Sequence, residues 1–254
     1  MFNADPFSII VLMVGLSLLP FLAMVATSYL KIVVVLSLIR NALGIQSIPP
    51  NMVINALALI LTFYIMAPIL GESWDICSKR LAENQVSTQS AAGTVEQPKT
   101  GPIAAASGLG LMAEGAAELE PRTKIMAEAA EPFRRFLLRE TQEKQIAYFV
   151  RTAERLWAKE GPNGELEPVK VDPQSYFVLL PAFCISELTK AFQIGFLVYL
   201  PFIAIDIIIS NILLAMGMMM VSPVTISLPF KLLLFVMVNG WTMLIQGLVQ
   251  SYMH

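Results

Sequence analysis

The sequence predicts an all-α, membrane-associated protein in which about four long, kinked hydrophobic helices form hairpins on either side of a polar helical insert. Three observations support this prediction. Hydrophobic residues make up 56% of the 254-residue chain, and its mean hydropathy of +0.66 is too apolar for an ordinary soluble domain. The charged residues gather in the middle of the chain, and several uncharged runs are long enough to cross a bilayer as helices.

The distribution of charge divides the chain into three parts. Thirteen of the 17 Lys and Arg residues, and fifteen of the 19 Asp and Glu residues, lie between residues 71 and 171. We therefore expect an N-terminal hydrophobic hairpin over residues 1–70, a polar insert over 71–171 and a C-terminal hydrophobic hairpin over 172–254. Prolines and glycines interrupt the apolar runs more often than simple anchors need, so the helices are expected to pack against many neighbours.

The first hairpin is expected to consist of helices over residues 7–42 and 51–70. Gly44 and the Pro49-Pro50 pair separate them, because proline cannot continue a helix. The first apolar run is longer than a signal-peptide core and has no basic residue before Lys31, so we expect it to be retained. Lys31 and Arg40 lie on the short link between the first two apolar runs, and basic residues there favour a cytoplasmic position for that link.

The polar insert is expected to contain two kinds of segment. Residues 82–123 include a stretch rich in Ala, Gly, Ser, Thr and Gln, which is typical of a flexible tether. Residues 131–160 place apolar side chains three and four positions apart, with Pro132 suited to a first helical position. This spacing predicts an amphipathic helix, which the Gly161-Pro162-Asn163-Gly164 sequence would end.

The second hairpin is expected to begin with a helix over residues 182–221 that bends at Pro201. A turn over residues 222–229 and a helix over residues 230–252 would complete it. The residues expected to give the hairpin its loop and hinges are Pro201, Gly217, Pro223 and Pro229. This arrangement places a methionine cluster near the hairpin's tip.

The methionine cluster is the most distinctive local feature of the chain, and it comprises Met216, Met218, Met219 and Met220. Unbranched thioether side chains repack easily around a changing guest, which suggests an apolar pore constriction or an adaptable binding surface. Methionine is also common in buried helices, so lipid-facing or core-filling roles remain open on this pattern alone.

Few charges lie within the apolar blocks, and each requires a partner. Glu187 and Lys190 are three residues apart on a predicted helix and can pair. Asp206 has no basic residue within ten positions, which leaves Lys31, Lys190 and Lys231 as candidates. We consider three roles for Asp206: a structural or inter-subunit ion pair, a water-exposed acid at interfacial depth, and a proton-coupling acid.

Composition excludes several classes of function. A net charge of −2 without a basic stripe argues against a nucleic-acid partner. His254 is the only histidine, and Cys77 and Cys184 stand far apart, so no metal, cofactor or catalytic constellation is expected. We find no phosphate-binding glycine loop. The chain is therefore expected not to be an enzyme.

The sequence resembles the FliP family of flagellar export gates and its injectisome counterparts, the SctR family of type III secretion. Nearly the whole chain takes part, except about residues 82–123. The matching segments, in order, are KIVVV (31–35), RNALG (40–44), IPPN (48–51), PFR (132–134), FLL (136–138), SELTKAFQIGF (186–196), PFIAID (201–206), MGMMM with SP (216–223), LPFK (228–231) and GW (240–241).

This resemblance implies a core subunit of the export apparatus in the bacterial inner membrane, projecting toward the periplasm. It implies assembly with other copies, with a small hairpin subunit and with a related larger subunit into a helical, pore-containing oligomer. Unfolded secreted proteins would pass through this pore, and membrane lipid would surround the complex. The long tether and the absence of a visible cleavable leader favour the injectisome branch.

The resemblance also assigns roles to residues. The four methionines would form a gasket at the narrowest point of the pore. We assign Glu187, Lys190, Asp206 and Lys231 to helix packing or inter-subunit contacts. The alternative function is that of a small-solute or proton-coupled transporter, which the broken helices and Asp206 would also suit.

Overall fold

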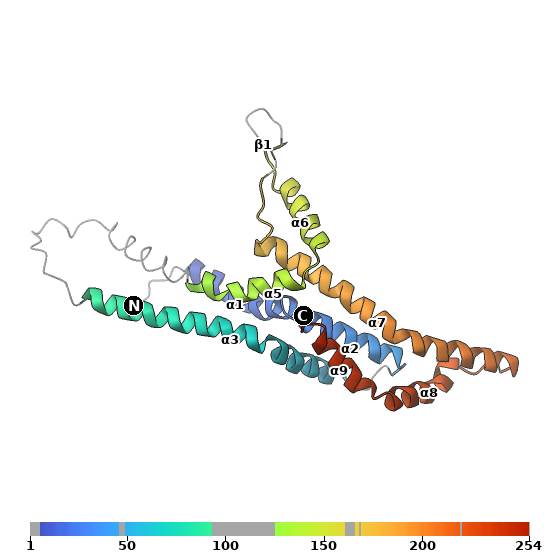
Figure 1. The fold of residues 1–254 in the computed structure, drawn as a ribbon. Coiled ribbons are helices and arrows are strands. Elements are labelled where there is room, and N and C mark those ends of the chain that lie inside the picture. Colours follow the sequence, from blue (N-terminus) through green and yellow to red (C-terminus); the bar gives the residue numbers. More distant parts are fainter. Residues whose placement is uncertain are drawn as a thin grey trace, which may run out of the picture. The chain divides into compact units, whose positions relative to one another are not determined.

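The computed structural model describes residues 6–45, 49–92, 125–160, 166–167, 169–218 and 220–253. Figure 1 shows an architecture built almost entirely from helices, which confirms the predicted fold class. The helices are α1 (Pro6–Val25), α2 (Tyr29–Ala42), α3 (Asn51–Ala92), α5 (Glu131–Glu140), α6 (Glu143–Leu156), α7 (Tyr176–Ala215), α8 (Pro223–Met237) and α9 (Gly240–Gln250).

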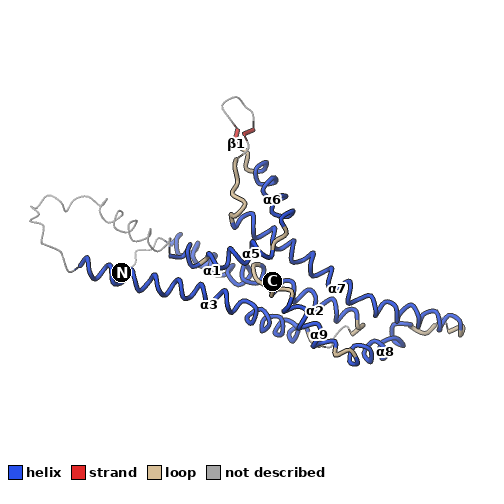
Figure 2. Tube along the Cα trace, in the orientation of Figure 1, coloured by secondary structure: helices blue, strands red, loops and turns tan. Residues whose placement is uncertain are grey.

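A single small β-ribbon interrupts this pattern within the described residues. Strands β1 (Lys159–Glu160) and β2 (Leu166–Glu167) pair antiparallel, with Lys159 opposite Glu167. Figure 2 shows the ribbon between α6 and α7 in the chain.

The chain forms two compact units. The first comprises Met1–Met66 and Leu137–His254, and the second comprises Ala67–Phe136. The second unit contains the later part of α3 and the first part of α5. Its ion pairs, Arg135 with Glu72 and Arg80 with Glu128, are about half exposed. Exposed pairs of this kind contribute little to stability.

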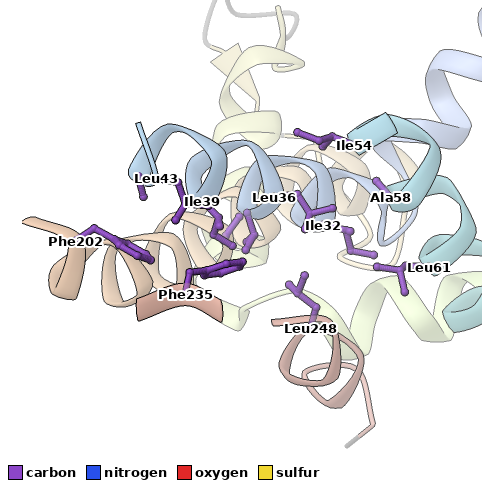
Figure 3. Close-up of a cluster of buried hydrophobic side chains, with 13 residues drawn as sticks. Ile32, Leu36, Ile39, Leu43, Ile54, Ala58, Leu61, Phe202, Phe235 and Leu248 are labelled. Atoms are coloured by element: carbon purple, nitrogen blue, oxygen red, sulfur yellow. The ribbon is translucent and has the colours of Figure 1, made fainter. Parts of the chain in front are cut away.

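The core of the first unit forms where α2 packs against α7, the most extensive helix contact in the structure (Figure 1). A Cβ atom on Gly195 would lie 2.4 Å from Leu38 Cδ1, so the glycine allows this close approach. Side chains from α3, α8 and α9 complete the core around α2. Figure 3 shows its main members, which are Ile32, Leu36, Ile39, Leu43, Ile54, Ala58, Leu61, Phe202, Phe235 and Leu248.

The helix expected over residues 7–42 is two helices, with a 60° bend between α1 and α2. The hydroxyl of Thr27 donates a hydrogen bond to the carbonyl of Ala23 and accepts one from the amide of Tyr29. Such back-bonding competes with the backbone ladder and bends helices. Pro20 lies inside α1 and does not end it.

The helix expected over residues 51–70 continues as α3 to Ala92. The segment after Gly71 contains Glu, Lys, Arg, Gln and Ala, which are all good helix formers, so the loss of hydrophobicity does not end the helix. Residues 82–92, expected to belong to the tether, are therefore helical. The remainder of that segment, from 93 to 123, lies outside the described residues.

The amphipathic helix expected over 131–160 is also divided, into α5 and α6. The break falls at Thr141 and Gln142. Thr141 donates its hydroxyl hydrogen to the carbonyl of Leu137 at 2.6 Å, and Gln142 has an extended backbone. The second helix ends at Leu156, before the predicted glycine-proline stop, because the chain enters β1.

The second hairpin differs from the prediction at three boundaries. Helix α7 begins at Tyr176 and runs without interruption through Pro201 to Ala215. Helix α8 begins at Pro223, so most of the turn expected over 222–229 is helical. The helix expected over 230–252 breaks at Asn239, whose backbone is left-handed with φ +50°, and α9 follows.

Two described helical stretches, Asn51–Ala82 and Tyr176–Ala215, are long and apolar enough to cross a membrane. The number rises to four if the bent pairs α1–α2 and α8–α9 each count as one span. Both numbers rest on length and composition alone, and the larger one equals the four spans that hydropathy predicts.

Candidate functional site: the methionine-rich turn and the charges behind it

The turn that carries the methionines is built by a glycine at the end of α7. Gly217 has φ +73°, a left-handed conformation that glycine adopts without steric cost. The amide of Met218 donates to the carbonyl of Leu213 at 2.9 Å, and the amide of Gly217 donates to Leu214 at 3.0 Å. This pair of hydrogen bonds is the Schellman motif, which satisfies the last carbonyls of a helix.

Helix α8 then begins with a proline at its first turn. Ser222 is extended and Pro223 occupies a first helical position, where the missing N–H costs nothing. Pro229 and Pro201, both expected at hinges, lie inside α8 and α7. The described residues of the turn are therefore fixed by Gly217 and Pro223.

The described methionines of the turn project away from the core. Met216 is 66% exposed, Met218 44% and Met220 101%, whereas Met66 in the core of the first unit is 2% exposed. Met219 lies outside the described residues. The three described side chains consequently do not fill the core of this chain, and they are available to a neighbouring molecule.

A carboxylate joins the two helices behind the turn. Asp206 Oδ2 lies 2.6 Å from Lys231 Nζ, and Asp206 Oδ1 accepts a hydrogen bond from Ser227 Oγ at 2.6 Å. Lys231 and Ser227 are buried, while the Asp206 side chain remains 31% exposed. Of the three candidate lysines, Lys231 is therefore the partner within this chain, and it links α8 to α7.

A second cluster of charged side chains surrounds Glu187, which is itself fully buried. Its Oε1 lies 3.1 Å from Lys190 Nζ, and its Oε2 lies 3.3 Å from Lys31 Nζ. Tyr252 donates its phenolic hydrogen to the same carboxylate and places its ring 3.5 Å from the Lys31 ammonium. The cluster combines ion pairing with a cation–π contact, which together compensate the burial of these charges. Burial and the Glu187 carboxylate raise the pKa of Tyr252, so its phenol stays protonated.

The same cluster anchors the elbow between α5 and α6. Lys190 Nζ donates to the carbonyl of Glu140 at 2.6 Å, and Ser186 Oγ accepts a hydrogen bond from the Gln142 amide at 3.0 Å. Both groups belong to helix ends, where backbone donors and acceptors lack partners within the helix. Two side chains of α7, Ser186 and Lys190, thus provide hydrogen-bond partners for backbone groups at the junction of α5 and α6.

Sequence comparisons agree with this architecture. The FliP family model matches residues 12–248 of the chain. Yop proteins translocation protein R of Yersinia pestis is 45% identical over 248 residues, covering 98% of this chain and 97% of that protein. The Hypersensitivity response secretion protein HrcR of Ralstonia nicotianae is 41% identical over 250 residues, covering 98% and 99%. The Flagellar biosynthetic protein FliP of Pectobacterium carotovorum is 40% identical over 243 residues, covering 96% and 77%.

The chain belongs to the FliP family. This confirms the resemblance described above and places the protein in the export apparatus of type III secretion. Members of the FliP family are structural subunits of that apparatus and not enzymes. Within the described residues of this member, no three His, Cys, Asp or Glu side chains are placed to hold a metal ion.

Sequence reasoning missed two members of the buried cluster of this FliP family protein. Lys31 was interpreted as a marker of membrane orientation and as a candidate partner of Asp206, but its side chain is completely buried and pairs with Glu187. Its position in an uncharged run was the available signal, because such a lysine needs an internal partner. Tyr252 gave no comparable signal, since a tyrosine near the end of an apolar helix is unremarkable.

Proposed function

We propose that this chain is a core subunit of the type III protein export gate and that its methionine-rich turn closes the pore around passing unfolded proteins. The observation that carries the proposal is the exposure of Met216, Met218 and Met220 on a turn of fixed shape. Flexible thioethers on a turn of defined backbone conformation can form an apolar seal that yields to side chains of different sizes. Met219 is proposed to complete this gasket.

Assembly is the second part of the proposal. Other copies of this chain, a small hairpin subunit and a related larger subunit would surround the pore, with membrane lipid outside. An apolar surface on α7 is consistent with extensive contacts to other proteins. An open apolar groove of about 500 Å³ follows one face of α7, lined by Ile185, Leu188, Thr189, Phe192, Gln193 and Phe196. Exposed apolar surface of this kind marks protein or lipid contacts. We place the complex in the inner membrane, projecting toward the periplasm.

The gasket can be tested by ion conductance through the purified, co-expressed complex. Replacing Met218, Met219 and Met220 with alanine removes most of each side chain from the proposed gasket. The leak of small ions should therefore increase, while assembly is preserved. Replacing Met237 and Met243, which are similarly exposed on α8 and α9, provides the matched control. Equal conductance in the gasket variant, the control variant and the wild type would reject the seal.

A proton-coupled or small-solute transporter is the competing function, and the partial exposure of Asp206 is the observation that favours it. Both carboxylate oxygens of Asp206, however, already engage Lys231 and Ser227. The transporter would work as a single polypeptide in lipid vesicles, whereas the export gate needs its partner subunits. Solute or proton flux from the chain alone would favour the transporter.

A further inference from the structure

The α8–α9 segment is held much more firmly at its far end than beside the methionines. At the far end, Tyr252 is buried against Glu187 and Lys31, and Leu248 lies in the hydrophobic core. These contacts join α9 and the turn after it to both α7 and α2. We call residues 231–253 the base of the hairpin.

The corner between α8 and α9 belongs to this base and has a fixed shape. A Cβ atom on Gly240 would lie 2.2 Å from the ring of Phe235, so the ring covers the glycine directly. Phe235 also meets Trp241 edge to face, with the ring centroids 5.3 Å apart. Because the rings of Phe235 and Trp241, on either side of Asn239, pack together, the angle between α8 and α9 is held by side-chain contacts.

The part of the hairpin next to the methionines lacks comparable packing. We call residues 216–230 the tip. Most of its large apolar side chains are exposed, namely Met216, Met218, Met220, Val224, Ile226 and Phe230, whereas Val221 and Leu228 are half-buried. Among its described side chains Ser227 is buried, and this residue touches Asp206. The hydrogen bond from Ser227 to Asp206 is the polar side-chain contact that joins the tip to α7.

We infer that Asp206 is the restraint that sets how far the methionine-rich tip can move while the base stays fixed. One carboxylate oxygen holds Ser227 inside the tip, and the other holds Lys231 at the first residue of the base. Few buried apolar contacts and exposed side chains are the marks of a segment that opens locally at low cost. Loss of the Asp206 contacts would free the tip without unfolding the hairpin.

This inference gives the proposed gasket a physical means of yielding, and in that sense it rests on the proposed function. An unfolded chain entering the pore would displace the tip, while Tyr252 and Phe235 keep the base, residues 231–253, in place. The restraint itself is a property of this chain and can be measured without any passenger protein.

Hydrogen–deuterium exchange of the full chain in detergent tests the inference directly. Asp206→Asn keeps the shape of the side chain but removes the charge that Lys231 faces. Amides of residues 224–230 should then exchange about tenfold faster or more, while residues 240–253 and α2 keep their wild-type rates. Ser227→Ala removes one of the two contacts and should give a smaller change in the same residues.

Tyr252→Phe is the matched variant for the base, and it should accelerate exchange in residues 244–253 and leave 224–230 unchanged. If Asp206→Asn accelerates 224–230 and 240–253 together, or changes neither, the division into tip and base is wrong. Should Asp206→Asn prevent folding, Ser227→Ala alone decides between these outcomes. A conductance result that rejects the gasket would leave the exchange result standing, so the two proposals fail separately.

Discussion

Tyr252 donates its phenolic hydrogen to the carboxylate of Glu187, a residue 65 positions earlier in the chain. The same ring covers the ammonium of Lys31, which is 0% exposed. A single side chain after α9 therefore completes the environment of two opposite charges on α2 and α7. Its neutral phenol supplies a donor to the carboxylate, and its π face supplies electron density to the cation.

Replacing Tyr252 with phenylalanine should destabilise the protein by about 1–3 kcal/mol, because Glu187 loses a donor that water cannot replace. The ring and its contact with Lys31 remain. The change is measured as a lower midpoint of thermal unfolding in detergent. Tyr148→Phe removes a hydroxyl from an exposed ring on α6 and should leave that midpoint unchanged. Equal midpoints for the Tyr252 variant and the wild type would mean that the buried hydrogen bond contributes no stability.

Replacing Glu187 with glutamine should cost about 3–5 kcal/mol, because the buried Lys31 ammonium is left without its counter-charge. Denaturant unfolding followed by circular dichroism measures this loss. Combining Glu187→Gln with Lys31→Met removes both charges and should restore most of the lost stability. Glu154→Gln on α6 is the control for removing a carboxylate that has no such cation. A double variant no more stable than Glu187→Gln would contradict the pairing.

Replacing Gly217 with alanine should destabilise the turn by about 1–2 kcal/mol, because φ +73° brings the new Cβ close to the backbone. Nothing lies within 4 Å of that position, so the cost is conformational rather than a clash with neighbours. Gly247 in α9 has equally open surroundings but a helical backbone. Gly247→Ala should therefore raise the unfolding midpoint while Gly217→Ala lowers it, and two shifts of the same sign would refute the explanation.

Replacing Gly195 with alanine should destabilise the contact between α2 and α7 by about 1–3 kcal/mol through overpacking. The new Cβ would meet Leu38 at Cδ1 and also, at 3.3 Å, at Cβ, so rotation of the leucine alone cannot relieve the contact. Adding Leu38→Ala to this variant should recover part of the loss. The double-mutant cycle, measured by thermal unfolding, would show no coupling if the two residues were not in contact.

Hydrophobicity and charge were sufficient to predict a helical fold and the approximate position of each apolar segment. The ends of the helices were harder, because sequence reasoning relied on proline and glycine. Pro20 and Pro201 lie inside helices, whereas Thr27 and Asn239 mark breaks. A threonine or asparagine breaks a helix through local hydrogen bonding or an unusual backbone conformation, which composition alone does not specify.

At the site, contacts between residues close in sequence could be predicted, and contacts between residues far apart in sequence could not. Glu187 and Lys190 are three residues apart on one helix, so their contact followed from helical geometry. Three lysines were possible partners for Asp206, and only the folded chain selects Lys231. The exposure of the methionines depends on which way the turn projects, and the sequence does not encode that direction locally.

The distance in sequence between Glu187 and Tyr252 also orders events during synthesis. A ribosome must add 65 residues after Glu187 before the tyrosine exists, while Lys31 has long since emerged. The nascent chain therefore holds Glu187 and Lys31 without the Tyr252 ring until residue 252 has been added. A polypeptide released before residue 252 would leave Glu187 and Lys31 without their contact to Tyr252. Proteases and chaperones can act on such an incompletely packed chain.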